Sequence, residues 1–197
     1  MSDQFQHVMV LTSIIIGLGI TNALLGVSGA IERYTESHRP LQLSWASAVW
    51  LVQVFLWMIL FWWWEFRLVD ILKRWTLWNY FLIVCYAFVL FLLVALLVPK
   101  DWDKVDDMNA YFLLKRRWFY SVFLLGAVID VMDSYMKGGW TYIMGQGVLG
   151  WAYPVANILV VAIGLRSTRI RTHTIMGIVF FVWEVVLGFD VSPLLHR

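Results

Sequence analysis

The chain has 197 residues, of which 61% are hydrophobic and only 14% are charged, and its formal net charge is +2. A soluble domain carries charged side chains at roughly a quarter of its positions, so this composition excludes an ordinary soluble globular protein. The small net charge gives no reason to expect a nucleic-acid partner. The single cysteine, Cys85, excludes an intrachain disulfide.

Long apolar runs dominate the sequence, and runs of about 18 residues or more are typical of helices that span a lipid bilayer. Polar links divide these runs into six segments. The sequence therefore predicts an all-α, polytopic transmembrane bundle, with residues 1–197 forming a single domain and no sizeable soluble part. The predicted spans cover about 8–31, 43–64, 78–98, 118–136, 140–165 and 174–190.

The first predicted span differs from a cleaved signal peptide in two ways. The preceding stretch "MSDQFQH" contains no Lys or Arg, and the apolar run is longer than the roughly 7–15 residues of a signal core. We therefore expect a retained helix. Its segment "GLGITNALLGVSGA" places small residues along one flank, which favours close packing against a helix of the same chain or of another copy. These helix-packing residues are Gly19, Ala23, Gly26 and Ala30.

The link "VDDMNAYFLLKRRW" admits two interpretations of comparable weight. In the first, Asp106 caps an interfacial helix whose last turn carries the basic residues Lys115, Arg116 and Arg117, an arrangement that the helix dipole favours. In the second, the segment is an ordinary solvated link between the third and fourth spans.

Basic residues predict how the chain is oriented in the membrane, because Lys and Arg are retained on the cytoplasmic side. Ten of the fifteen Lys and Arg residues lie in the links that follow the first, third and fifth spans. We therefore expect these links in the cytoplasm and both termini on the non-cytoplasmic side.

Apart from Asp190, the last residue of the sixth predicted span, three acidic residues lie inside predicted spans, where a charge costs at least about 2.5–3.5 kcal/mol. Asp130 and Asp133, in "LLGAVIDVMDSYMKGG", share one face of the fourth span, and Glu184 lies in the sixth. At a rise of 1.5 Å per residue, Asp130 and Glu184 lie roughly 18 and 15 Å into parallel spans. The functional interpretation is a titratable proton or cation site. In the structural alternative, Asp133 pairs with Lys137 and the other two acids are protonated and bind neighbouring helices.

Amide side chains extend this candidate pathway. The fifth span, "GQGVLGWAYPVAN", also combines glycines with Pro154, which is typical of the broken helices that bind substrates in transporters. An ordinary bent helix explains the same pattern and is the favoured interpretation. The candidate polar-pathway residues are Asn22, Gln53, Gln146 and Asn157.

Motifs of catalysis and of cofactor binding give no support to an enzyme. The four histidines lie outside the central parts of the apolar runs, so neither a haem site nor a metal site is expected. The patterns GxSxG, HExxH and paired cysteines are missing from the sequence. Most of the thirteen tryptophans lie near predicted span ends, as in an aromatic belt at the lipid headgroups. We expect no cofactor.

The stretches "FQHVMVLTSIIIGLGITNALLGVSG" and "YFLLKRRWFYSVFLL" resemble small, uncharacterised multi-pass membrane proteins of bacteria. This resemblance implies a bacterial inner membrane and a retained first helix. Together with the intramembrane acids, the sequence favours a small proton- or cation-conducting channel or transporter. The alternative is a non-catalytic scaffold or accessory subunit of a larger membrane complex. The expected partners are membrane lipids and either further copies of the chain or another membrane protein.

Overall fold

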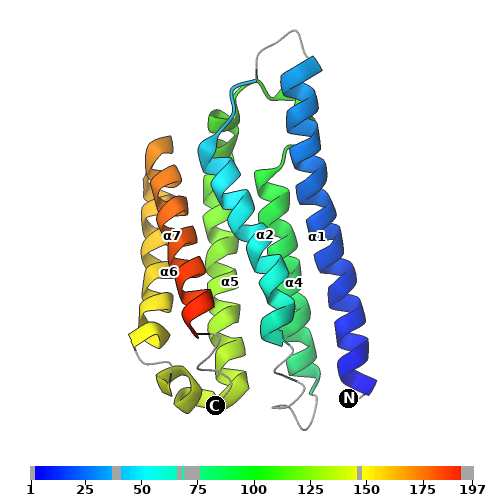
Figure 1. The fold of residues 1–197 in the computed structure, drawn as a ribbon, viewed down its shortest axis with the longest axis vertical. Coiled ribbons are helices and arrows are strands. Elements are labelled where there is room, and N and C mark those ends of the chain that lie inside the picture. The colour runs from blue at the N-terminus through cyan, green and yellow to red at the C-terminus, as the bar shows by residue number, and fades with distance from the viewer. Residues whose placement is uncertain (1–2, 37–40, 66–67, 69–75, 146–147, 192–197) are drawn as a thin grey trace.

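The computed structural model describes residues 3–36, 41–65, 68, 76–145 and 148–191. These residues form six α-helices and one short 3-10 helix, and the described ranges contain no β-strand. Successive helices run up and down in one bundle (Figure 1). The elements are α1 (Asp3–Glu36), α2 (Trp45–Glu65), α4 (Leu77–Leu97), η1 (Trp102–Lys104), α5 (Met108–Gly145), α6 (Val148–Arg166) and α7 (Ile170–Val191).

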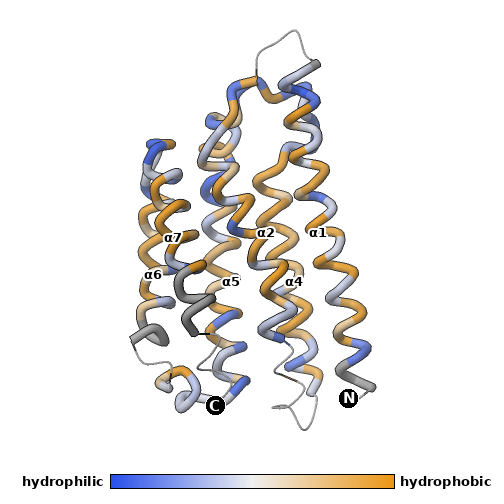
Figure 2. The backbone as a smooth tube through the Cα atoms, viewed as in Figure 1, coloured by the Kyte–Doolittle hydropathy of each residue, from blue (hydrophilic) through white to orange (hydrophobic). Residues whose placement is uncertain are grey.

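Within the described residues, four helices are long and apolar enough to cross a membrane: Gln6–Thr35, Trp45–Glu65, Leu77–Leu97 and Met108–Gly145. In α6 the apolar stretch Ala152–Arg166 is shorter. Figure 2 shows hydrophobic residues mainly along the middle of the bundle and hydrophilic residues mainly at its two ends. The predicted all-α membrane architecture is therefore confirmed in its coarse form, whereas the number of six spans stays a prediction.

The bundle has two ends, which we name from their positions in Figure 1. The upper end holds the end of α1, the start of α2 and the link between α4 and α5. The lower end holds the start of α1, the end of α2 and the start of α4. The first and last described residues both lie toward the lower end, as an even number of alternating helices requires.

Polar side chains and one proline set the helix boundaries at the upper end. Helix α4 ends before Pro99, which disfavours helical backbone at the residue preceding it. Asp107, and not Asp106 as expected, accepts from the backbone N of Asn109 (2.7 Å) at the start of α5. Asp106 instead binds the guanidinium group of Arg33 at 2.7 Å. The expected interfacial helix is simply the first turns of α5, which continue without a break into the predicted fourth span.

A kink at Gly138 and Gly139 ends the long straight part of α5. Gly139 has φ 64° and ψ −158°, a conformation that side chains with a Cβ rarely adopt. The tight turn expected at "KGG" is therefore present. The chain does not enter the next long helix directly, however. Residues 140–145 form a short helical piece after the kink, and α6 begins only at Val148, so the expected fifth range, 140–165, contains two helical pieces.

Helices α2 and α5 lie inside the bundle. Helix α2 packs against α1, α4, α5 and α7, and α5 packs against α2, α4 and α6. Helix α1 packs mainly against α4 and lies at the edge of the bundle (Figure 1). Aromatic rings fill the centre between α2, α5 and α7, with ring centroids about 5–6 Å apart, as edge-to-face packing favours. We call this group the aromatic core; its members are Trp50, Phe119, Tyr120, Phe123 and Phe180.

Candidate functional site

A buried group of charges lies at the lower end of the bundle, and we call it the lower triad. Lys137 Nζ lies 3.3 Å from Glu65 Oε1 and also contacts Asp133 Oδ2. Each of the three side chains is at most 6% exposed. The second carboxylate oxygens, Glu65 Oε2 and Asp133 Oδ1, have no hydrogen-bond partner among the described residues. One ammonium group therefore contacts two carboxylates, and each carboxylate has one oxygen without a hydrogen-bond partner among the described residues.

The charges of the lower triad do not balance. Because Glu65 and Asp133 contact the same nitrogen, the two contacting oxygens lie within about 6 Å of each other. At an effective dielectric constant of about 20, two full charges at that distance repel by about 3 kcal/mol. Lys137 offsets the charge of only one carboxylate, so the fully ionised triad carries one excess negative charge in a buried position. Binding one proton removes this excess charge.

Asp130 lies on the same face of α5 as the triad, further inside the bundle. Residues 130, 133 and 137 follow the three- and four-residue spacing that stacks side chains along a helix. At 1.5 Å per residue, Asp130 lies about 10 Å along the axis from Lys137. Its Oδ1 accepts a hydrogen bond from the Tyr86 hydroxyl of α4 at 3.2 Å, and its side chain is half-buried.

Glu184 on α7 is buried and tied to two other helices. The indole Nε1 of Trp57 on α2 donates to Glu184 Oε2 at 2.7 Å. The hydroxyl of Tyr153 on α6 donates to Glu184 Oε1 at 2.8 Å. Each oxygen of this carboxyl group therefore has one donor, and the two donors come from different helices.

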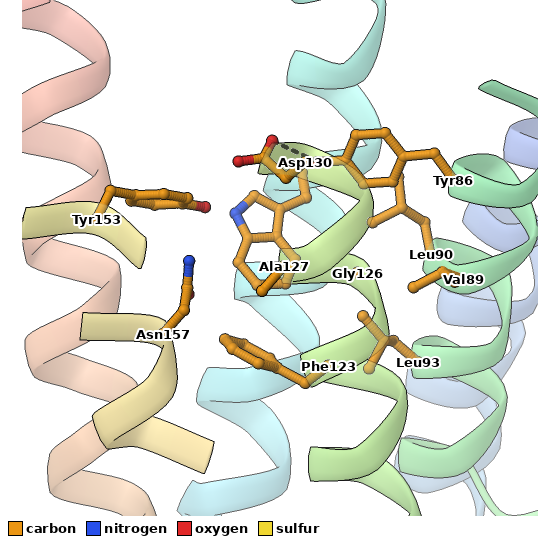
Figure 3. Close-up of a pocket in the computed structure, with 11 residues that line it drawn as sticks. Tyr86, Val89, Leu90, Leu93, Phe123, Gly126, Ala127, Asp130, Tyr153 and Asn157 are labelled. Carbon is orange, nitrogen blue, oxygen red and sulfur yellow. Dashed lines mark hydrogen bonds between the residues drawn. The ribbon is translucent and has the colours of Figure 1, made fainter. Parts of the chain in front are cut away.

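A small cavity lies between Asp130 of α5 and Tyr153 and Asn157 of α6 (Figure 3). Its volume is about 20 Å³, and both donors to Glu184, Trp57 and Tyr153, belong to its lining. Figure 3 shows Tyr153 and Asn157 on one side and Asp130 on the other, with their polar ends directed toward the same space. Of the two acids expected to lie at similar depths, Asp130 lines this cavity, whereas Glu184 is connected to it through its donors Trp57 and Tyr153.

Gln53 extends the polar groups one helical turn beyond Trp57 on α2. Its side chain is completely buried, and both its Nε2 and its Oε1 have no hydrogen-bond partner among the described residues. Beyond it along α2 lies Trp50 of the aromatic core. We call the polar groups from the lower triad up to Gln53 the polar column. Its members are Glu65, Asp133, Lys137, Asp130, Glu184, Tyr153, Asn157 and Gln53.

The remaining sequence-predicted residues lie elsewhere. Asn22 is half-buried on α1, at the edge of the bundle, so the structure does not bring it to the polar column. Gln146 lies outside the described residues. The small flank of α1 packs within the chain: a Cβ at Gly19 would lie 2.8 Å from Met58 Sδ, and one at Gly26 would lie 2.5 Å from Val98. Ala23 is buried in the same interface, whereas Ala30 borders an apolar groove of about 330 Å³ between α1 and α2.

Glu65 and His173 are buried polar residues that sequence reasoning missed. Glu65 ends an apolar run and was interpreted as the start of a polar link. Its spacing from Gln53 through residues 57 and 61 follows a four-residue period, which could have placed it on the same buried face.

His173 lies at the start of α7, and its side chain is fully buried. Its Nδ1 lies 2.9 Å from the Tyr120 hydroxyl, and its Nε2 lies 3.2 Å from the carbonyl oxygen of Ser167. Because a carbonyl only accepts, Nε2 carries the proton and Nδ1 accepts from Tyr120. Trp50 Nε1 also donates to the His173 carbonyl at 3.2 Å. These bonds give His173 a packing role that joins α7 to α2 and α5.

Known proteins offer no template for this site. No protein-family model, curated protein or solved structure matches the chain. Within the described ranges, no group of three or more His, Cys, Asp or Glu side chains is arranged to hold a metal ion. The chemistry of the site therefore has to be inferred from its own carboxyl groups.

Proposed function

We propose that this integral membrane protein transfers protons along the polar column. The supporting observation is that four carboxyl groups from three helices, Glu65 of α2, Asp130 and Asp133 of α5, and Glu184 of α7, belong to the polar column, whose one lysine, Lys137, contacts Glu65 and Asp133. Burying so many carboxyl groups is expensive unless some of them carry protons. Intramembrane acids of this kind are typical of proton relays.

The aromatic core favours a carrier over an open channel. Trp57, which donates to Glu184 of the polar column, packs against Phe123 with ring centroids 5.4 Å apart, and Trp50 packs against Phe123 at 5.6 Å. These closely packed rings stand between the polar column and the upper end of the bundle. A proton bound in the column would therefore reach the upper side only after the helices around the rings rearrange.

The distribution of basic residues supports an orientation. At the upper end, the described residues include the basic cluster Lys115, Arg116 and Arg117 and also Arg166, Arg169 and Arg171. The rule that positive residues stay in the cytoplasm then places the upper end inside. Protons would enter the column from the non-cytoplasmic side of a bacterial inner membrane.

Proton flux in liposomes tests the proposal. Purified protein is reconstituted into vesicles that contain a pH-sensitive dye, and a potassium diffusion potential drives the flux. We expect Asp130→Asn and Glu184→Gln to lower proton flux at least tenfold. The matched control is Asp103→Asn, since Asp103 is an exposed carboxylate in η1 and should not affect the flux. If the wild-type protein moved neither protons nor monovalent cations at any pH, the proposal would be wrong.

The alternative of a membrane scaffold has less support. It depended on the small-residue flank of α1 being available to another protein, but Gly19, Ala23 and Gly26 are covered by α2 and α4 of the same chain. The same liposome experiment distinguishes the two functions. A scaffold would move no protons, so Asp130→Asn would cause no change in proton flux relative to the wild type.

A further inference from the structure

Proton transfer along the polar column requires a connection between Asp130 and Glu184, and direct contacts do not supply it. Asp130 accepts from Tyr86 of α4, whereas Glu184 accepts from Trp57 and Tyr153. A proton moves only over hydrogen-bond distances, so a group that both accepts and donates must lie between the two carboxyl groups.

The cavity between Asp130 and Tyr153, which donates to Glu184, has the size and the polar partners that one water molecule needs. Its volume of about 20 Å³ exceeds the roughly 10–15 Å³, measured in the same way, that a single water requires. A buried water also needs two to four polar partners. Asp130, Tyr153 and Asn157 supply a carboxylate, a hydroxyl and an amide that are directed toward the same space (Figure 3).

Most of the other residues that line the cavity are apolar, although Trp57 and Tyr86 also belong to its lining. Phe123, Leu90 and Leu93 offer only hydrocarbon surface, and Gly126 and Ala127 are the small residues that leave the space unfilled. A Cβ at Gly126 would lie 3.1 Å from Val89, so the helices are already close together there. The shape of the cavity therefore suits a single small polar molecule held by groups at fixed positions.

We propose that this cavity binds one water molecule that bridges Asp130 to Tyr153 and so links the two acids in a proton-transfer path. The bridge rests on the proposed function and specifies its route. In one transfer, protonated Asp130 gives its proton to the water, the water gives one of its protons to the Tyr153 oxygen, and Tyr153 releases its hydroxyl proton to Glu184, to which it already donates. The water remains a water molecule and Tyr153 remains neutral. One proton leaves Asp130 and one arrives at Glu184.

Two variants test the bridge in different ways. Ala127→Leu fills the cavity with hydrocarbon, and Asn157→Leu removes a polar partner of the water while keeping the number and branching of the side-chain heavy atoms. The matched control is Val128→Leu, because Val128 neighbours the cavity wall in sequence but is 49% exposed on the outer face of α5. We expect both cavity variants to lower proton flux at least tenfold and the control to retain wild-type flux.

Infrared difference spectroscopy supplies a second measurement that does not depend on transport. A bound water should give an O–H band that shifts in H₂¹⁸O, and this band should be present in the wild type and in Val128→Leu but lost in both cavity variants. The bridge is supported only if flux and band change together. Suppose that the wild type conducts protons. The bridge alone would be overturned if Ala127→Leu and Asn157→Leu left the proton flux unchanged, or if the wild type lacked the water band. A wild type that conducts nothing would overturn the proposed function, while the band would still decide whether the water site exists.

Discussion

Replacing Lys137 by Met tests the electrostatic account of the lower triad. Methionine preserves much of the side-chain volume and removes the ammonium group, so Glu65 and Asp133 are left buried without their shared cation. Their mutual repulsion of about 3 kcal/mol is then unopposed, because the contacting oxygens lie within about 6 Å of each other. Removing one partner of a buried ion pair typically destabilises a protein by about 3–5 kcal/mol, and we expect a loss in this range at pH 8.

The loss should depend on pH, because a proton can replace the missing ammonium charge. The folded variant would hold a proton that the unfolded chain, with its exposed carboxylates, does not hold above about pH 5. When the folded state binds more protons than the unfolded state, the free energy of unfolding falls as pH rises, by about 1.4 kcal/mol per pH unit for each extra proton. Lys137→Met should therefore be markedly closer to wild type at pH 5.5 than at pH 8.

Reversible unfolding in mixed micelles, followed by tryptophan fluorescence at both pH values, measures these differences. Lys104→Met is the matched control, since Lys104 pairs with Asp101 in an exposed loop position and its loss should have no measurable effect. Adding Glu65→Gln to Lys137→Met should restore part of the lost stability at pH 8. A variant as stable as the wild type at pH 8, or equally destabilised at both pH values, would refute the reasoning.

Two further predictions concern packing and backbone conformation. Gly139→Ala should destabilise the protein by about 1–3 kcal/mol, because φ is 64° at Gly139; Gly17→Ala, where a Cβ would meet nothing within 4 Å, should not destabilise it in the same unfolding assay. Tyr120→Phe should cost about 1–3 kcal/mol by leaving Nδ1 of buried His173 without its donor, whereas Tyr135→Phe, at a residue that is 53% exposed, should be neutral. Equal stabilities of either variant and its control would contradict the corresponding prediction.

Apolar run length predicted most of the fold, because a helix is the structure that satisfies the backbone within a lipid-facing segment. Run length failed where the chain changes direction within an apolar segment, because hydropathy does not show where a helix bends or ends. Residues 140–145 contain no charged residue and so continued the predicted apolar run, yet they form a separate piece after the kink at Gly139. Hydropathy likewise could not locate the first turns of α5, where a polar start at Asp107 and an apolar interior belong to one continuous helix.

Depth along a span predicted part of the site. Of the two acids placed at similar depths from the sequence, Asp130 lines the cavity, and Glu184 accepts a hydrogen bond from Tyr153 in its lining. Asn22 also has a suitable depth, but depth does not state which helices are neighbours, and α1 packs against α4 at the edge of the bundle. The pairing of Asp133 with Lys137 followed from their four-residue spacing. The contact between Glu65 and Lys137 could not be predicted in this way, because it requires α2 to pack beside α5.

The position of Glu184 connects proton binding to helix packing. An ionised carboxylate accepts hydrogen bonds that are roughly twice as strong as those of a neutral group. Glu184 receives one such bond from Trp57 of α2 and one from Tyr153 of α6, so its ionised form holds three helices together. Protonation would weaken both bonds at once. Trp57 is also the residue that packs directly against Phe123 of the aromatic core. A proton arriving at Glu184 would therefore loosen the contact between the polar column and the rings that close it, which is the coupling that a proton carrier needs and an open channel does not.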